Sequence, residues 1–149
     1  MNDLEDLYQE LIRDHSKSPR NYRELKDANR TAEGDNPLCG DHYKIFVRLD
    51  GEKITDIGFQ GNGCAISKAS ASLLTETIKG KSIADAKKLF DNVRDMVTTG
   101  EAKQNQLGKL IALSGVHKFP ARVKCAILSW HALAAALAGK DETVTTEES

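Results

Sequence analysis

Three cysteines and one aspartate are the residues of this chain best suited to chemistry. Cys39 lies in a loop with glycine and proline, Cys64 between a predicted hairpin and a predicted helix, and Cys125 early in the last predicted helix. Asp41 follows Cys39 with only a glycine between them, so a carboxylate and a thiolate could share one metal. Three thiolates and a carboxylate suit tetrahedral Zn²⁺ or the edge of an iron–sulfur cluster. Alternatively, each cysteine is a small buried apolar residue, a common role for this side chain.

A β-hairpin is predicted over residues 41–61, directly after the first cysteine. Apolar residues alternate with polar ones along its first strand: Tyr43, Ile45, Val47 and Leu49. Asp50 and Gly51 supply the turn, because glycine tolerates the positive φ that tight hairpin turns require. The returning strand contains Ile54, Ile57 and Phe59, and its slip in phase between 54 and 57 indicates a β-bulge.

Helical periodicity precedes the first cysteine and resumes after the hairpin. Apolar stripes predict helices near the N-terminus, after Cys64, from Ser82, over about 105–114 and from Pro120. A strand at 31–33 has only weak support in the pattern. The elements predict an α+β fold, with a small antiparallel sheet of two to three strands covered on one face by several helices.

Length and composition limit the number of domains and the classes of partner and location that the chain could have. The 149 residues, 40% hydrophobic and 29% charged, suit one domain, predicted over 1–138, and the acidic segment 139–149 is predicted to be a disordered tail. The net charge of -1 argues against a nucleic-acid partner. No apolar run approaches the ~20 residues of a membrane helix. The acidic start lacks a secretory h-region, so we expect a cytoplasmic protein with free thiols.

Two segments resemble a known family. Residues 36–41 (Asn-Pro-Leu-Cys-Gly-Asp) and 61–72 (Gly-Asn-Gly-Cys-Ala-Ile-Ser-Lys-Ala-Ser-Ala-Ser) are similar to the signature segments of the IscU/NifU N-terminal family of iron–sulfur cluster assembly proteins. The resemblance extends from the first helix to the last. Within the family the chain looks like the SufU-type branch. Lys124 stands where IscU-type scaffolds have a histidine, and residues 81–100 resemble part of an insertion typical of that branch.

The resemblance implies a fold, a metal and a partner. The fold would be of the SufE/NifU or IscU type, and Zn²⁺ would be bound by Cys39, Asp41, Cys64 and Cys125. The protein would accept sulfur from a SufS-type cysteine desulfurase, with Cys39 receiving the persulfide sulfur. It would pass this sulfur to downstream Suf assembly proteins or to apoprotein acceptors.

The chemistry of such a site leaves several functions open. Four protein ligands leave a zinc ion no open position, so sulfur transfer requires one ligand to leave, and Cys39 in its Gly/Pro loop is the best placed to do so. The alternative function is a scaffold that assembles a transient [2Fe–2S] cluster on the same ligands and transfers it to apoproteins. A third possibility is an adaptor in which zinc is purely structural.

Arg122 is the one supporting residue that the sequence suggests. It lies three residues before Cys125, on the same face of the predicted helix. A cation there would offset the negative charge of the ligands and could pair with Asp41. The alternative is an ordinary solvated arginine.

Overall fold

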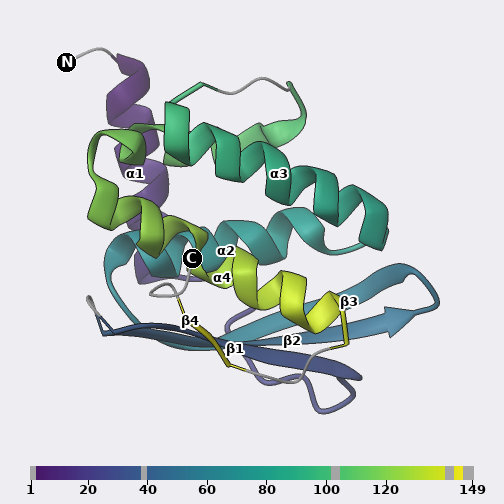
Figure 1. The fold of residues 1–149 in the computed structure, drawn as a ribbon. Coiled ribbons are helices and arrows are strands. Elements are labelled where there is room, and N and C mark those ends of the chain that lie inside the picture. The colour runs from purple at the N-terminus through teal and green to yellow at the C-terminus, as the bar shows by residue number, and fades with distance from the viewer. Residues whose placement is uncertain (1–2, 38–39, 102–104, 140–142, 146–149) are drawn as a thin grey trace.

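A four-stranded sheet with helices layered on one face forms the molecule (Figure 1), as expected for an α+β fold. The computed structural model describes residues 3–37, 40–101, 105–139 and 143–145. Its elements follow in this order: α1 (Asp3–Lys17), β1 (Arg30–Asn36), β2 (Asp41–Asp50), β3 (Lys53–Asn62), α2 (Ala65–Ile78), α3 (Ile83–Thr99), the 3₁₀ helix η1 (Asn105–Lys118), α4 (Pro120–Leu137) and β4 (Thr143–Thr145). The strand order is β3-β2-β1-β4.

The predicted hairpin is confirmed as β2 and β3, with its turn at Gly51, whose φ is 63°. The apolar positions of both strands are buried against the helices. Arg48 pairs with Asp56 and Leu49 pairs with Ile54, so Thr55 is the extra residue of a bulge. The predicted slip in phase is therefore a real irregularity of the ladder.

The other two strands differ more from the expectation. β1 is seven residues long, antiparallel to β2, and extends well beyond the weak strand predicted at 31–33. Its buried positions are Ala32, Gly34 and Asn36. A side chain at Gly34 would begin 3.0 Å from Leu128 of α4, so β1 lies closely against that helix. β4 pairs with β1 in parallel, within the segment where the sequence predicted a disordered tail.

The core lies between the sheet and the helices. Trp130 of α4 is fully buried, as are Tyr43 of β2 and Phe59 of β3. α1 packs on α2, and α4 packs on β1, β2 and α2. α3 begins at the N-cap Ser82, whose side chain accepts a hydrogen bond from the Asp85 N–H, and ends at Gly100 in the left-handed conformation.

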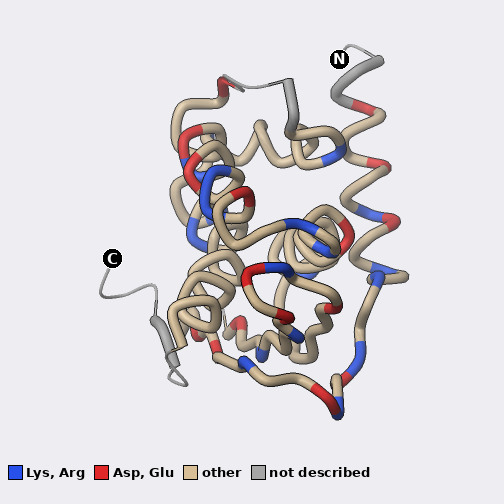
Figure 2. The backbone as a smooth tube through the Cα atoms, turned by 90° about the vertical axis from the view of Figure 1, so that its right-hand side faces the viewer, with Lys and Arg blue, Asp and Glu red and all other residues tan. Residues whose placement is uncertain are grey.

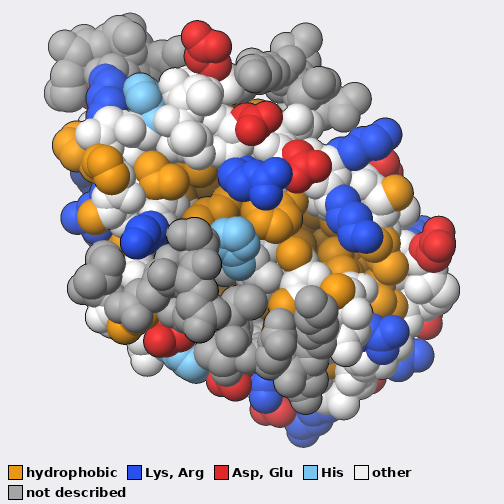
Figure 3. Space-filling view, viewed as in Figure 1, with side chains coloured by type: hydrophobic (Ala, Val, Ile, Leu, Met, Phe, Trp, Pro, Cys, Tyr) orange, Lys and Arg blue, Asp and Glu red, His pale blue; other side chains and the backbone are white. Residues whose placement is uncertain are grey.

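Both signs of charge are interspersed along the chain (Figure 2), in keeping with the near-neutral balance of the sequence. On the face seen in Figure 1, hydrophobic side chains gather in a band with charged side chains around it (Figure 3). Among the residues that the structure describes, no helix has the length and apolar character needed to cross a membrane.

Candidate metal centre

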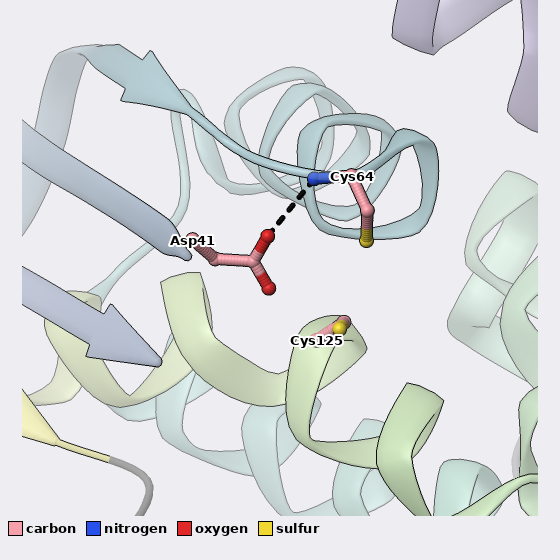
Figure 4. A group of neighbouring side chains, drawn as sticks. All are labelled: Asp41, Cys64 and Cys125. Carbon is pink, nitrogen blue, oxygen red and sulfur yellow. Dashed lines mark hydrogen bonds between the residues drawn. The ribbon is translucent and has the colours of Figure 1, made fainter. Parts of the chain in front are cut away.

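Three of the four predicted ligands meet at one end of the sheet. Asp41 is the first residue of β2, Cys64 is the N-cap of α2, and Cys125 lies in the second turn of α4. One potential ligand atom from each residue lies within 4.8 Å of the other two (Figure 4). The fourth predicted ligand, Cys39, lies outside the described residues.

The hairpin and the helix packing together explain this meeting. The first residues of β2 pair with the last residues of β3, and the chain then turns through Gly63 into α2. Cys64 is thereby held 2.9 Å from Asp41, measured from its backbone N to Oδ1. Because α4 packs across β1 and β2, it brings Cys125 to the same place.

Asp41 is fully buried, and polar groups of the chain surround its carboxylate. Oδ1 accepts a hydrogen bond from the Cys64 N–H and lies 3.2 Å from the Ser67 hydroxyl. Oδ2 accepts a hydrogen bond from Asn36 Nδ2 at 3.2 Å. The same Asn36 nitrogen lies 3.7 Å from Cys125 Sγ, so one amide contacts two of the predicted ligands.

The two sulfur atoms have different environments. Cys125 is fully buried, whereas Cys64 is partly exposed. A hydrogen bond from the Cys125 thiol is the main reason that the pKa of Cys64 falls to about 5, and donors on Ser67 lower it further. Desolvation of Cys64 and the nearby Asp41 charge act in the opposite direction. Cys64 is therefore the thiol that ionises readily at neutral pH.

The chemistry of the described donors fits a metal ion. Two cysteine sulfurs and a carboxylate oxygen are ligands that Zn²⁺ accepts, and thiolates also bind iron–sulfur clusters. A buried carboxylate beside two thiols is costly without a cation, because like charges in a poorly solvated site repel. Asp41, Cys64 and Cys125 are therefore suited by chemistry and proximity to hold such an ion.

A groove leads from the surface to Cys64. It has a volume of about 800 Å³ and is lined by α1, η1 and the first residues of α2 and α4. Arg122 and Phe119 are both in its lining, and the Phe119 side chain is 60% exposed. Arg122 forms no ion pair with Asp41 among the described residues, although the sequence allowed one. It lines the same groove as Cys64 instead.

The sequence interpretation missed the residues around Asp41. The sequence pattern placed Tyr43 only among the apolar positions of a strand, and it gave Ser67 and Asn36 no role beyond membership of the two signature segments. Tyr43 and Ser67 are indeed buried, but their hydroxyl oxygens lie 2.8 Å apart beside the carboxylate. Their place within or next to the two signature segments was the available signal.

Comparison with known proteins identifies a family match and close relatives. The model of the NifU-like N terminal domain family matches residues 7–138. The zinc-dependent sulfurtransferase SufU of Bacillus subtilis (strain 168) is 46% identical over 131 residues, which cover 87% of this chain and 88% of that protein. The iron–sulfur cluster assembly scaffold protein IscU of Streptococcus pyogenes serotype M1 is 43% identical over 135 residues, covering 90% of this chain and 84% of that protein.

Solved structures agree with the fold. A protein of Fervidobacterium islandicum AW-1, described as a candidate iron–sulfur cluster assembly scaffold for the SUF system, superimposes with a TM-score of 0.82 at 38% identity. That match covers 86% of this chain and 94% of the other. The N-terminal part of a NifU-like protein from Brucella abortus also gives 0.82, covering 91% and 95% of the two chains; at 18% identity it shows the fold alone.

Proposed function

Since the chain belongs to the NifU-like N terminal domain family, we propose that it acts in iron–sulfur cluster assembly as a zinc-dependent sulfur acceptor. Its partner is a cysteine desulfurase of the SufS type, and it works in the cytoplasm. The sulfur goes on to other Suf assembly proteins or to apoproteins. The relative that is 46% identical, a zinc-dependent sulfurtransferase, supports this reading.

One observation supports the proposal above the others. Asp41, Cys64 and Cys125 come from three separate elements, and their potential ligand atoms lie within 4.8 Å of one another. We propose that Cys39, two residues before Asp41, completes this set. Zinc bound there would supply a Lewis acid that keeps its cysteine ligands deprotonated at neutral pH.

Cys39 is the proposed acceptor of sulfur. Its thiolate attacks the outer sulfur of the persulfide on the desulfurase. The sulfur–sulfur bond of that persulfide breaks, a new sulfur–sulfur bond forms on Cys39, and the electron pair leaves with the desulfurase cysteine as a thiolate. No net oxidation occurs. The cation of Arg122, in the groove that reaches Cys64, supports the transfer by attracting the anionic persulfide.

The first test combines metal content with desulfurase turnover. We expect the purified chain to hold one zinc and to raise the turnover of a SufS-type desulfurase, and the Cys39→Ala variant to lose this stimulation because the nucleophile is gone. Lys87→Ala, an exposed change on α3, serves as the control and should stimulate normally. A Cys39→Ala protein that stimulates as well as the wild type would contradict the proposal.

The second candidate function is that of a scaffold for iron–sulfur cluster assembly, because the relative that is 43% identical is such a scaffold protein. The described sulfur ligands can also bind a [2Fe–2S] cluster. Lys124, adjacent to Cys125, replaces the histidine expected of IscU-type scaffolds and disfavours this function. Anaerobic reconstitution with iron and sulfide, followed by incubation with an apo-ferredoxin, distinguishes the two. Efficient transfer of a cluster would favour the scaffold.

A further inference from the structure

The carboxylate of Asp41 has most of its hydrogen-bonding capacity already in use. A carboxylate offers about four lone-pair sites, two on each oxygen. Oδ1 faces two donors, the Cys64 N–H at 2.9 Å and the Ser67 hydroxyl at 3.2 Å. Oδ2 faces one, Asn36 Nδ2 at 3.2 Å. Since Asp41 is fully buried, one site on Oδ2 is what the described residues leave free.

The direction of the hydrogen bonds follows from the proton count. Tyr43 has one hydroxyl proton, and its hydroxyl lies 2.8 Å from Ser67 Oγ. If Tyr43 donates to Ser67, the single Ser67 proton remains for another acceptor. The Cys64 carbonyl at 3.0 Å already accepts the Lys68 N–H, and a charged carboxylate is the stronger acceptor. The chain of donation therefore runs from Tyr43 through Ser67 to Asp41.

Gly63 shows how closely these groups are assembled. A Cβ at this position would contact Ser67 Oγ and would lie 2.5 Å from Asp41 Oδ1 and 2.6 Å from the Tyr43 hydroxyl. On the opposite side, the two protons of the Asn36 amide suffice for both Asp41 Oδ2 and Cys125 Sγ. The carboxylate is thus fixed from both sides by side chains that bind no metal themselves.

We infer that Tyr43, Ser67 and Asn36 are positioning residues that make Asp41 a one-oxygen metal ligand, bound through Oδ2. The Cys64 N–H and the Ser67 hydroxyl occupy Oδ1 and hold the carboxylate plane, and Tyr43 orients the Ser67 hydroxyl. Asn36 fixes Oδ2 relative to Cys125. This inference rests on the proposed function only for the presence of a metal, and it concerns how firmly and in what geometry the metal is held.

The test measures metal release, with no desulfurase present. The full chain and its Ser67→Ala and Tyr43→Phe variants are loaded with zinc, and the rate of zinc transfer to an excess of a coloured chelator is recorded. We expect release to be about ten- to a hundredfold faster in both variants, the usual effect of removing a group that orients a ligand. Cobalt-substituted samples should show a changed visible absorption spectrum, because Ser67→Ala removes one donor from Oδ1 and Tyr43→Phe removes the group that orients that donor.

Ser72→Ala is the matched control. Ser72 is also a buried serine of α2 with hydrogen bonds, but its partners are His15 and the Arg20 N–H. This variant should lose thermal stability and keep the wild-type release rate and cobalt spectrum. Two outcomes would overturn the inference. In the first, Ser67→Ala and Tyr43→Phe release zinc at the wild-type rate. In the second, the Ser72→Ala control releases zinc as fast as they do. Tyr43→Phe removes one oxygen only, so folding should survive. A wild type that holds zinc but does not stimulate the desulfurase would contradict the proposed function alone.

Discussion

At the scale of single residues, the two described cysteines differ in how easily they lose a proton. The Cys125 thiol donates to Cys64 and is itself fully buried, whereas Cys64 borders the groove. Cys64 is therefore the described cysteine that a reagent in solution can reach. The environment of each sulfur gives the pair a defined order of reaction.

This difference predicts a pH profile for alkylation. In metal-free protein with Cys39→Ala, Cys64 should react with iodoacetamide increasingly as pH rises through about 5, because the thiolate is the nucleophile. Adding Cys125→Ala removes the main donor, so the pKa of Cys64 should rise and the profile should shift to higher pH. The pH dependence of the alkylation rate, followed by mass spectrometry, is the measurement. Coincident profiles for the two proteins would contradict the hydrogen bond.

The residues that surround the ligands were harder to predict than the ligands. Cys64, Asp41 and Cys125 could be proposed because thiols and a carboxylate in a recognised pattern have few other uses. Tyr43 and Ser67 have many uses, and a strand or helix pattern classifies them as core or packing residues. Only the three-dimensional meeting of β2 with the first turn of α2 reveals that Tyr43 contacts Ser67 and that Ser67 contacts Asp41.

At the scale of elements, the hairpin could be predicted from the sequence pattern, whereas the full extent of β1 could not. Apolar residues alternate along β2 and β3 with a period of two, so the pattern predicted both strands. The break in that alternation predicted the bulge in β3. β1 buries Ala32, Gly34 and Asn36, and small or polar residues give no hydrophobic signal. At Gly34 a small residue is needed because Leu128 of α4 lies directly against it. β4 depends on pairing with residues more than a hundred positions earlier, which no local pattern encodes.

The contact between α1 and α2 leads to a prediction about acid. His15 of α1 is fully buried, and its Nδ1 lies 2.7 Å from Ser72 Oγ of α2. Ser72 Oγ also accepts a hydrogen bond from the Arg20 N–H, and Nε2 has no hydrogen-bond partner among the described residues. Desolvation, aided by the Arg20 charge, lowers the pKa of His15 below 6.5. The contact between α1 and α2 therefore favours the neutral form of the His15 ring over the charged form.

Folding stability should therefore fall on acidification. Above pH 6.5 the ring is neutral in both folded and unfolded chains, and the contact keeps its full strength. Below it, the unfolded chain gains a proton that the folded chain resists, so the free energy of unfolding declines towards the lower folded pKa. His15→Asn, whose side-chain amide can hydrogen-bond to Ser72 in place of Nδ1 but does not titrate, should lessen this decline. Urea unfolding of metal-free protein at about pH 7.5 and about pH 5.5 measures it. An equal loss in both proteins would show that His15 is not responsible.

At the scale of the whole molecule, the candidate metal centre joins parts of the chain that are distant in sequence. β2, the N-cap of α2 and α4 each supply one of the candidate ligands that the structure describes. A metal that binds only the folded arrangement stabilises all of them together, by about 2.7 kcal/mol when its free concentration is a hundred times the dissociation constant. Metal removal should therefore lower the stability of the complete fold.

We expect the melting temperature of the zinc-loaded chain to fall by roughly 5–10 °C when a chelator removes the metal, given about 2–4 °C per kcal/mol for a chain of this size. The Cys125→Ala variant, which lacks one ligand, should melt at a lower temperature and respond much less to the chelator. Calorimetry with and without chelator measures both. A wild-type melting temperature that the chelator leaves unchanged would show that the ion does not stabilise the folded chain.

The position of Cys125 in α4 has a consequence for synthesis on the ribosome. A nascent chain that ends soon after α2 already contains Asp41 and Cys64, but the helix that packs across β1 and β2 has not yet been made. The described ligand set becomes complete only after translation passes residue 125 and α4 docks. Metal binding by all three described candidate ligands therefore has to wait until α4 has been made and has docked.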